Sequence, residues 1–346
     1  MRVGDARAVA SRWVAEHAPG VPAFAGAFLS GSAAWLPADA ELPATSDVDV
    51  LVVTAATPAP PKPGKLRFGG VLLEVTYLPA DRLASPEQVL SSCHLAGSLR
   101  VDTVLADPTG RLGRLQAAVA RHFAERRWVR RRCQDAEARI VDGLARLDRS
   151  RQLPAQVLAW LFPTGVTTHV LLTAGLRNPT VRLRYLAVQG LLADYGRAGF
   201  HEELLALLGC RHLARRRVEK HLTAMTEVFD AAAAVARTRF PFASDIAVAA
   251  RPIAVAGGRD LVAGGHHREA VFWIAATYAR CLNVLAADAP AAIRARHEPG
   301  FAALLGDLGV ADPAALGRRA REVLGFLPRL RQEAEVILAA NPGIVD

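Results

Sequence analysis

The spacing of hydrophobic positions along the chain changes at about residue 115. Before this point, short apolar runs are separated by glycine, proline and polar residues, a pattern typical of strands joined by turns. Strands are expected at residues 23–29, 47–54, 66–77 and 103–106, and helices at 5–17, from 33 to 36 and at 86–94. Gly69 and Gly70 are expected to form a bulge or a turn inside the third strand. This order of strands and helices predicts a mixed α/β sheet.

Beyond residue 115, apolar residues recur at helical spacing almost to the end of the chain. Helices are expected at 111–149 (as one helix or a pair), 166–176, 184–195, 202–210, 212–237, 269–287 and 313–341. The sequence therefore predicts an α+β protein in two parts. An N-terminal mixed-sheet domain is expected over residues 1–115, and an all-α helical substrate or accessory domain over residues 116–346.

The most apolar stretch, Pro154 to Leu176, raises the question of a membrane span. It contains Pro163, Gly165 and His169 as well as several threonines, so it lacks the unbroken run of about 20 apolar residues that a span needs. We expect two buried helices with a break between them, and no membrane partner.

The N-terminus and the cysteines indicate a cytoplasmic protein. Residues 1–10 carry charges and lack the apolar core of a signal peptide. The four cysteines form no Cys-x-x-Cys pair, so neither a zinc site nor a redox motif is indicated. Reduced thiols in a cytosol are expected.

A formal net charge of +9 favours anionic partners such as nucleotides, nucleic acid or acidic lipid head groups. Of the 42 basic residues, only Lys62, Lys65 and Lys220 are lysines, a usage typical of GC-rich genomes, so part of the charge reflects codon use. Two arginine-rich runs, 126–132 and 215–217, fit either a nucleic-acid surface or a solvated helix face. We expect the solvated face and keep nucleic-acid binding as the alternative.

Candidate chemistry begins with the segment Ser46-Asp47-Val48-Asp49, at the start of an apolar strand. Because side chains alternate faces along a strand, Asp47 and Asp49 project from the same face. Two neighbouring carboxylates repel each other and are costly to bury unless a cation lies between them. Carboxylate oxygens suit Mg²⁺, and two such ions about 3.5–4 Å apart form the clamp used for displacement at phosphorus.

A third carboxylate is available from Glu74, in the apolar strand segment 71–77. A charged residue in a strand that is otherwise expected to be buried needs a partner, and a metal ion is a natural one. The alternative is an edge residue that points to water.

Gly31-Ser32 lies between an expected strand and an expected helix start. Free backbone N–H groups and the helix dipole favour an anion there, and the serine hydroxyl can donate to it. Each of these signals is weak alone, because Gly-Ser is a common turn and Asp-x-Asp is often a cap.

Arg268 ends the run His266-His267-Arg268 before another expected helix. Cations at a helix N-terminus are unfavourable with the dipole unless an anion docks there. Arg268 is therefore a candidate contact to a triphosphate or an acceptor, and the alternative is a solvated loop.

Taken together, these residues resemble the signature of the polymerase-beta-like nucleotidyltransferase superfamily. That signature is an apolar residue, Gly-Ser or Gly-Gly, a spacer, Asp-x-Asp on a strand, and a later carboxylate on a neighbouring strand. The matching residues are Gly31, Ser32, Asp47, Asp49 and Glu74, and the resemblance covers about the first 110 residues. The spacer after Ser32 is slightly longer than usual, and the third carboxylate is Glu where Asp is commoner. The helical part is similar in layout to aminoglycoside nucleotidyltransferases.

The resemblance implies transfer of a nucleoside monophosphate from a nucleoside triphosphate, with ATP as the expected donor, to a hydroxyl of a small molecule with release of pyrophosphate. Asp47 and Asp49 would hold two Mg²⁺ ions. Glu74 would hold the ion beside the acceptor and help to deprotonate the hydroxyl. Nucleotide-binding roles are expected for Gly31, Ser32, Ser46 and, as the weakest assignment, Arg268.

The acceptor is open at this point. It could be an antibiotic or a biosynthetic intermediate, although a basic protein is not an obvious partner for cationic aminoglycosides. Nucleotidyl transfer to a macromolecule, either tRNA or a protein, is an alternative. A non-catalytic nucleotide-binding regulatory protein is another, and the oligomeric state is also open.

Overall fold

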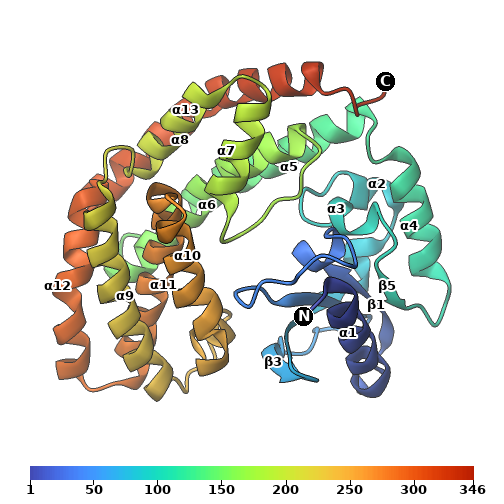
Figure 1. Cartoon of the computed structure of the whole chain (residues 1–346), viewed down its shortest axis with the longest axis horizontal. Coiled ribbons are helices and arrows are strands. Elements are labelled where there is room, and N and C mark those ends of the chain that lie inside the picture. The colour runs from blue at the N-terminus through green and yellow to red at the C-terminus, as the bar shows by residue number, and fades with distance from the viewer. The chain divides into compact units, whose positions relative to one another are not determined.

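The computed structural model describes the whole chain, residues 1–346, which divides into two compact units. The sheet unit comprises residues 1–132 with 343–346, and the helical unit comprises residues 133–342. The division falls within helix α5 (Arg126–Ala145), whereas the boundary expected after residue 115 falls inside α4 (Arg111–His122). The last residues belong to the sheet unit because the backbone N–H of Arg126 donates to the carbonyl of Val345 at 2.8 Å. The protein is therefore α+β, with a five-stranded mixed sheet followed by a mostly helical region (Figure 1).

The sheet has the order β3-β4-β2-β1-β5. Its strands are β1 (Phe24–Ser30), β2 (Val48–Thr54), β3 (Gly64–Phe68), β4 (Val71–Pro79) and β5 (Val104–Ala106). β2 and β4 are parallel, and the other neighbouring pairs are antiparallel. The stretch expected as one strand over 66–77 is a hairpin of β3 and β4. Gly69 and Gly70 make its turn with φ of 52° and 81°, a region that favours glycine.

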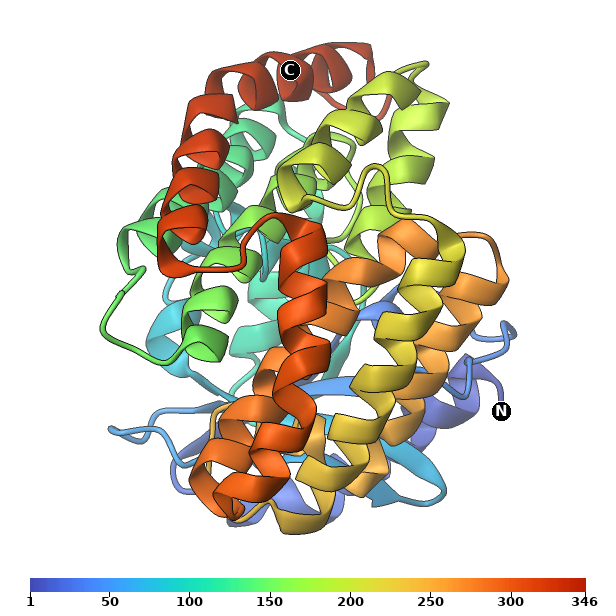
Figure 2. The same cartoon turned by 90° about the vertical axis from the view of Figure 1, so that its left-hand side faces the viewer.

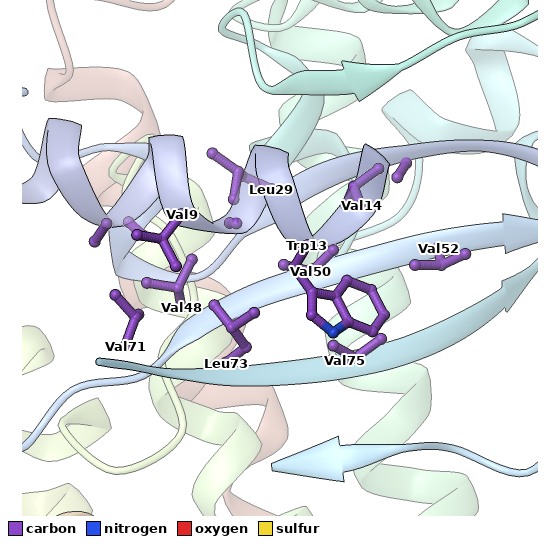
Figure 3. Packing of buried hydrophobic residues seen from close by; sticks show 14 of the residues in the cluster. Val9, Trp13, Val14, Leu29, Val48, Val50, Val52, Val71, Leu73 and Val75 are labelled. Atoms are coloured by element: carbon purple, nitrogen blue, oxygen red, sulfur yellow. The ribbon is translucent and has the colours of Figure 1, made fainter. Parts of the chain in front are cut away.

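Helix α1 (Val3–His17) covers one face of the sheet through a layer of buried apolar side chains. Figure 3 shows the members Val9, Trp13, Val14, Val48, Val50, Val52, Leu73 and Val75. Burying a valine or leucine contributes about 1.5–3 kcal/mol, and a slip of one residue would turn these side chains to the other face. The strand register is therefore strongly specified, and it directs Asp47, Asp49 and Glu74 to the face opposite α1.

Part of that opposite face is covered by α2 (Pro86–Leu90), α3 (Ala96–Leu99) and α4. Their apolar residues pack on Phe28 and Val53 of the sheet. Short helical turns complete the unit: η1 (Ala18–Gly20), η2 (Ser32–Ala34) and η3 (Ala80–Leu83). The helix expected from 33 to 36 is only the 3₁₀ turn η2, and Pro37, which has no N–H to donate, follows soon after it.

The helical unit is built from long helices, and Figure 2 shows α9, α11 and α12 running side by side. Its α-helices are α6 (Leu153–Ala174), α7 (Arg184–Asp194), α8 (Ala198–Leu208), α9 (Arg215–Val235), α10 (Gly257–Ala263), α11 (His267–Asp288), α12 (Ala291–Leu308) and α13 (Pro313–Ala340). Between α9 and α10 lie the short 3₁₀ helices η4 (Ala243–Ile246) and η5 (Val248–Ala250) and the π-helical segment η6 (Pro252–Ala256). Neither α10 nor α12 was predicted from the residue pattern.

The prediction of a helix break within 154–176 is wrong, because α6 continues through Pro163. The proline ring packs against Gly143 of α5, where a Cβ atom would lie 2.5 Å from Pro163 Cγ. The hydroxyls of Thr164, Thr167 and Thr168 donate to carbonyls of the preceding turn at 2.7–2.8 Å, so these three side chains are satisfied within the helix. Packing and local hydrogen bonds thus outweigh the cost of an interior proline, about 3 kcal/mol.

Two helices, α6 and α11, are long and apolar enough to cross a membrane by length and composition alone. In each, 78% of the most apolar window is buried within the protein. Core helices meet the same criteria, so this is weak support for a span.

Candidate metal centre

Three carboxylates meet at one end of β2 and β4. Asp47 directly precedes β2, Asp49 lies on it, and Glu74 lies on β4 as the register partner of Asp49. One oxygen of each lies within 4.8 Å of the others. Strand alternation places the two aspartates on one face, and the parallel pairing of β2 with β4 places Glu74 beside them.

The donor set fits a hard divalent cation. Carboxylate oxygens are the ligands that Mg²⁺ prefers, and oxygens bound to one Mg²⁺ lie at most about 4.2 Å apart, given metal–oxygen distances of about 2.1 Å. A small inward movement of the three side chains would therefore bring their oxygens to the separations found around one ion. Their partial burial strengthens the electrostatic attraction to a cation, because water screens it less.

Two lysines accompany the carboxylates. Lys65 of β3 is the register partner of Glu74, and its Nζ donates to Asp47 Oδ2 at 2.6 Å and to Glu74 Oε2. Lys62, in the linker before β3, donates to Glu74 Oε1. Neither lysine was predicted as a site residue, although the sequence contains a signal for them. Two of the chain's three lysines fall within 12 residues of Glu74 in a protein that otherwise uses arginine.

The carboxylates differ in their affinity for protons. Burial, together with the charges of Asp47 and Glu74, raises the pKa of Asp49 to about 8. Burial also raises the pKa of Asp47, against the opposing charge of Lys65. Burial pushes the pKa of Glu74 upward as well, but Lys65 and then Lys62 outweigh it, so that this pKa falls to about 2. Crowded carboxylates whose pKa values are pushed apart by burial and neighbouring charges are typical of functional sites.

Gly31 lies directly against Asp49. Its φ of 62° favours glycine, and a Cβ atom at this position would overlap Asp49 Oδ2. Ser32 follows as the exposed first residue of η2. A three-residue turn provides little helix dipole, so any anion here would depend on the N–H groups and the hydroxyl. Ser46 precedes Asp47, and its N–H donates to the carbonyl of Pro43 at 2.9 Å.

With this geometry in place, the chain can be compared with known proteins. No protein-family model matches it, and no curated protein matches it. What the site can do therefore follows from its donors, charges and neighbours.

The remaining candidate, Arg268, lies in the helical unit at the start of α11. Its guanidinium pairs with both carboxylate oxygens of Glu202 at 2.9 Å and donates to the carbonyl of Arg211 at 3.1 Å. The hydrogen bond from Arg268 lowers the pKa of Glu202. Arg268 thus has partners within its own unit.

The arginine-rich run 126–132 serves the core of the sheet unit in part. Trp128 is buried in the cluster beneath α2 and α4. Arg132 is buried too, and it donates to the carbonyls of Leu90 and Phe123 at 3.1 and 2.7 Å. Arg127, by contrast, keeps 68% of its side chain exposed. The tryptophan therefore packs in the core and is not available to stack on a base.

Gly31→Ala is expected to weaken divalent-metal binding at least about tenfold, because the new methyl group displaces the Asp49 carboxylate. The positive φ adds a strain of about 1–3 kcal/mol. Mn²⁺ affinity measured by electron paramagnetic resonance tests this. Gly196→Ala is the matched control, since Gly196 has a φ of 66° and nothing near its missing Cβ. Equal Mn²⁺ affinity in the two variants would contradict the role assigned to Gly31.

Proposed function

We propose that this protein is a Mg²⁺-dependent nucleotidyltransferase. It would transfer a nucleoside monophosphate from a nucleoside triphosphate, with ATP as the expected donor, to a hydroxyl of a small-molecule acceptor, and release pyrophosphate. One observation carries the proposal: Asp47, Asp49 and Glu74 converge from two parallel strands beside Gly31. The resemblance of these residues to the polymerase-beta-like nucleotidyltransferase signature supports it.

The residues present fit a magnesium centre. Asp47 and Asp49 would hold two Mg²⁺ ions, and Glu74 would hold the one beside the acceptor. Bound there, the ions would supply charge neutralisation for the phosphates. The N–H groups and hydroxyl at Gly31-Ser32 would orient the triphosphate.

The transfer itself is a displacement at the α-phosphorus. The acceptor oxygen forms a bond to this atom while the bond to the oxygen that bridges to the β-phosphate breaks, and pyrophosphate leaves with that bond's electron pair. The hydroxyl proton passes to a neighbouring carboxylate, for which Glu74 is the candidate because it would hold the ion beside the acceptor. Positioning and charge neutralisation account for most of the catalysis in such a site. The helical unit is proposed as the substrate or accessory part.

A thermal-shift screen of the four nucleoside triphosphates tests the proposal. We expect one of them, ATP first, to raise the melting temperature with Mg²⁺ and not with EDTA. A ligand at a hundredfold excess over its Kd stabilises the folded state by about 2.7 kcal/mol. Stabilisation together with pyrophosphate release would support the transferase.

The same screen separates the alternatives. Selective stabilisation without pyrophosphate release from any acceptor mixture would favour the non-catalytic regulator. No stabilisation by any of the four triphosphates would contradict nucleotide binding altogether.

A further inference from the structure

Lys65 lies where a metal ion has to bind. Its Nζ donates to Asp47 Oδ2 at 2.6 Å and also to Glu74 Oε2, so it bridges two of the three carboxylates. Only 5% of its side chain is exposed, which makes it a built part of the site. Lys62, with 33% of its side chain exposed, donates to the other oxygen of Glu74.

An ammonium group and a divalent cation cannot share these oxygens without cost. A Mg²⁺ ion binds a carboxylate oxygen at about 2.0–2.1 Å, and two cations a few ångströms apart in a partly buried site repel strongly. Metal binding by Asp47 and Glu74 therefore requires Lys65 to move off them.

The charge count indicates where Lys65 goes. The three carboxylates, when ionised, and the two lysines leave one net negative charge. Two divalent ions alone would convert this to three positive charges. A triphosphate brings about four negative charges, about two of them on its terminal phosphate. The positive charges of the metal ions and of both lysines are balanced only when the polyphosphate is present.

The residue type agrees with a group that has to move. The chain has 42 lysines and arginines, and only three of them are lysines, yet this site holds two of the three. A guanidinium would hold two carboxylates in a rigid fork, whereas an ammonium is a compact charge on a flexible stem that can change partners.

We infer that Lys65 is an internal counter-ion that competes with metal for Asp47 and Glu74 and transfers to the phosphates when a metal–polyphosphate complex binds, an inference that rests on the proposed function. Metal uptake is then coupled to the substrate. The free protein binds Mg²⁺ weakly, and the triphosphate and its metal ions enter the site together.

Lys65→Met tests the inference by two affinities that should change in opposite directions. Mn²⁺ binding without any phosphate, measured by electron paramagnetic resonance, is expected to become at least about tenfold tighter, because the competitor is gone. Binding of the Mn²⁺–tripolyphosphate complex, measured by calorimetry, is expected to become about tenfold weaker, because a phosphate partner is gone. A tenfold change corresponds to about 1.4 kcal/mol.

Two further variants complete the design. Lys220→Met makes the same charge change at a lysine on α9 and should alter neither affinity. Lys65→Arg retains the positive charge, and its Mn²⁺ affinity without phosphate should stay at or below the wild-type value. It also keeps the test informative if Lys65→Met does not fold.

The outcomes separate clearly. If both affinities of Lys65→Met fall, or neither changes, Lys65 is merely structural and the inference is overturned. It is also overturned if Lys65→Arg binds Mn²⁺ alone more tightly than the wild type. Failure of the proposed function shows instead in the wild type, as no stabilisation by any nucleoside triphosphate. The comparison of Mn²⁺ affinity between Lys65→Met and the wild type contains no nucleotide, so it does not depend on nucleotide binding.

Discussion

Asp49→Asn is expected to lower Mg²⁺-dependent pyrophosphate release by about a thousandfold. A metal ion supplies several kcal/mol of charge stabilisation at a reacting phosphate, and each 1.36 kcal/mol corresponds to a factor of ten in rate. The amide retains the size of the side chain and loses the charge that holds the cation. Release is measured with the triphosphate that the thermal-shift screen selects, over a range of Mg²⁺ concentrations.

The control for this variant is Asp39→Asn, at an exposed aspartate of the sheet unit. It should release pyrophosphate at the wild-type rate. Unchanged turnover in Asp49→Asn would remove the metal centre from the mechanism.

Stability of the metal-free protein provides an independent check on Asp49. In the folded state the pKa of Asp49 is raised to about 8, whereas its ordinary pKa is 3.8. Between these values the folded state binds more protons than the unfolded state, so the contribution of Asp49 to stability falls as pH rises. Asparagine has no proton to lose. In EDTA, urea unfolding should show Asp49→Asn as stable as the wild type near pH 4 and more stable near pH 8. A less stable variant at pH 8 would contradict the burial argument.

Glu74→Gln is expected to slow transfer by about a hundredfold, because it removes one carboxylate ligand while the aspartate pair remains. This corresponds to about 2.7 kcal/mol of transition-state stabilisation. Single-turnover rates of pyrophosphate release measure the chemical step directly. Glu87→Gln, at an exposed glutamate of α2, is the matched control and should react at the wild-type rate. A wild-type rate in Glu74→Gln would show that another residue is the third ligand.

Glu74→Gln and Asp49→Asn should affect the stability of the metal-free protein in opposite directions. The pKa of Glu74 is held at about 2, below its ordinary value of 4.5, by Lys65 and Lys62 against the effect of burial. Its stabilising contribution is therefore present above pH 4.5 and is lost as pH falls toward 2. At pH 8 in EDTA, Glu74→Gln should be less stable than the wild type and Asp49→Asn more stable. The same sign for both would contradict the assigned ion pairs.

The local residue pattern was sufficient to predict the elements of the sheet unit that bury only one face. The alternation Val48-Asp49-Val50 predicts both the strand and the shared face of the two aspartates, since side chains alternate along any strand. The turn at Gly69-Gly70 was predicted only as one of two options, because a bulge and a hairpin turn use the same residues.

Long helices were harder to predict where proline interrupts the sequence. α12 passes through Pro299 and Gly300, a dipeptide typical of a break. It stays helical because α11 supports it there. Tyr278 of α11 packs against Gly300, where an added Cβ atom would overlap the tyrosine hydroxyl. The same hydroxyl donates to the carbonyl of His297 at 2.8 Å. Contacts with another helix outweigh the local signal, as they do at Pro163 in α6.

The residue pattern was thus enough for the α+β class, for most element types and for the Asp47–Asp49 pair, because each depends on neighbours a few positions apart. Tertiary structure alone decided that β4 pairs in parallel with β2, that Asp49 faces Glu74, and that Lys65 reaches both carboxylates from β3. Those contacts depend on which strands pair and in what register. Burial of the whole apolar layer under α1 selects that pairing, and no local stretch of the chain contains it.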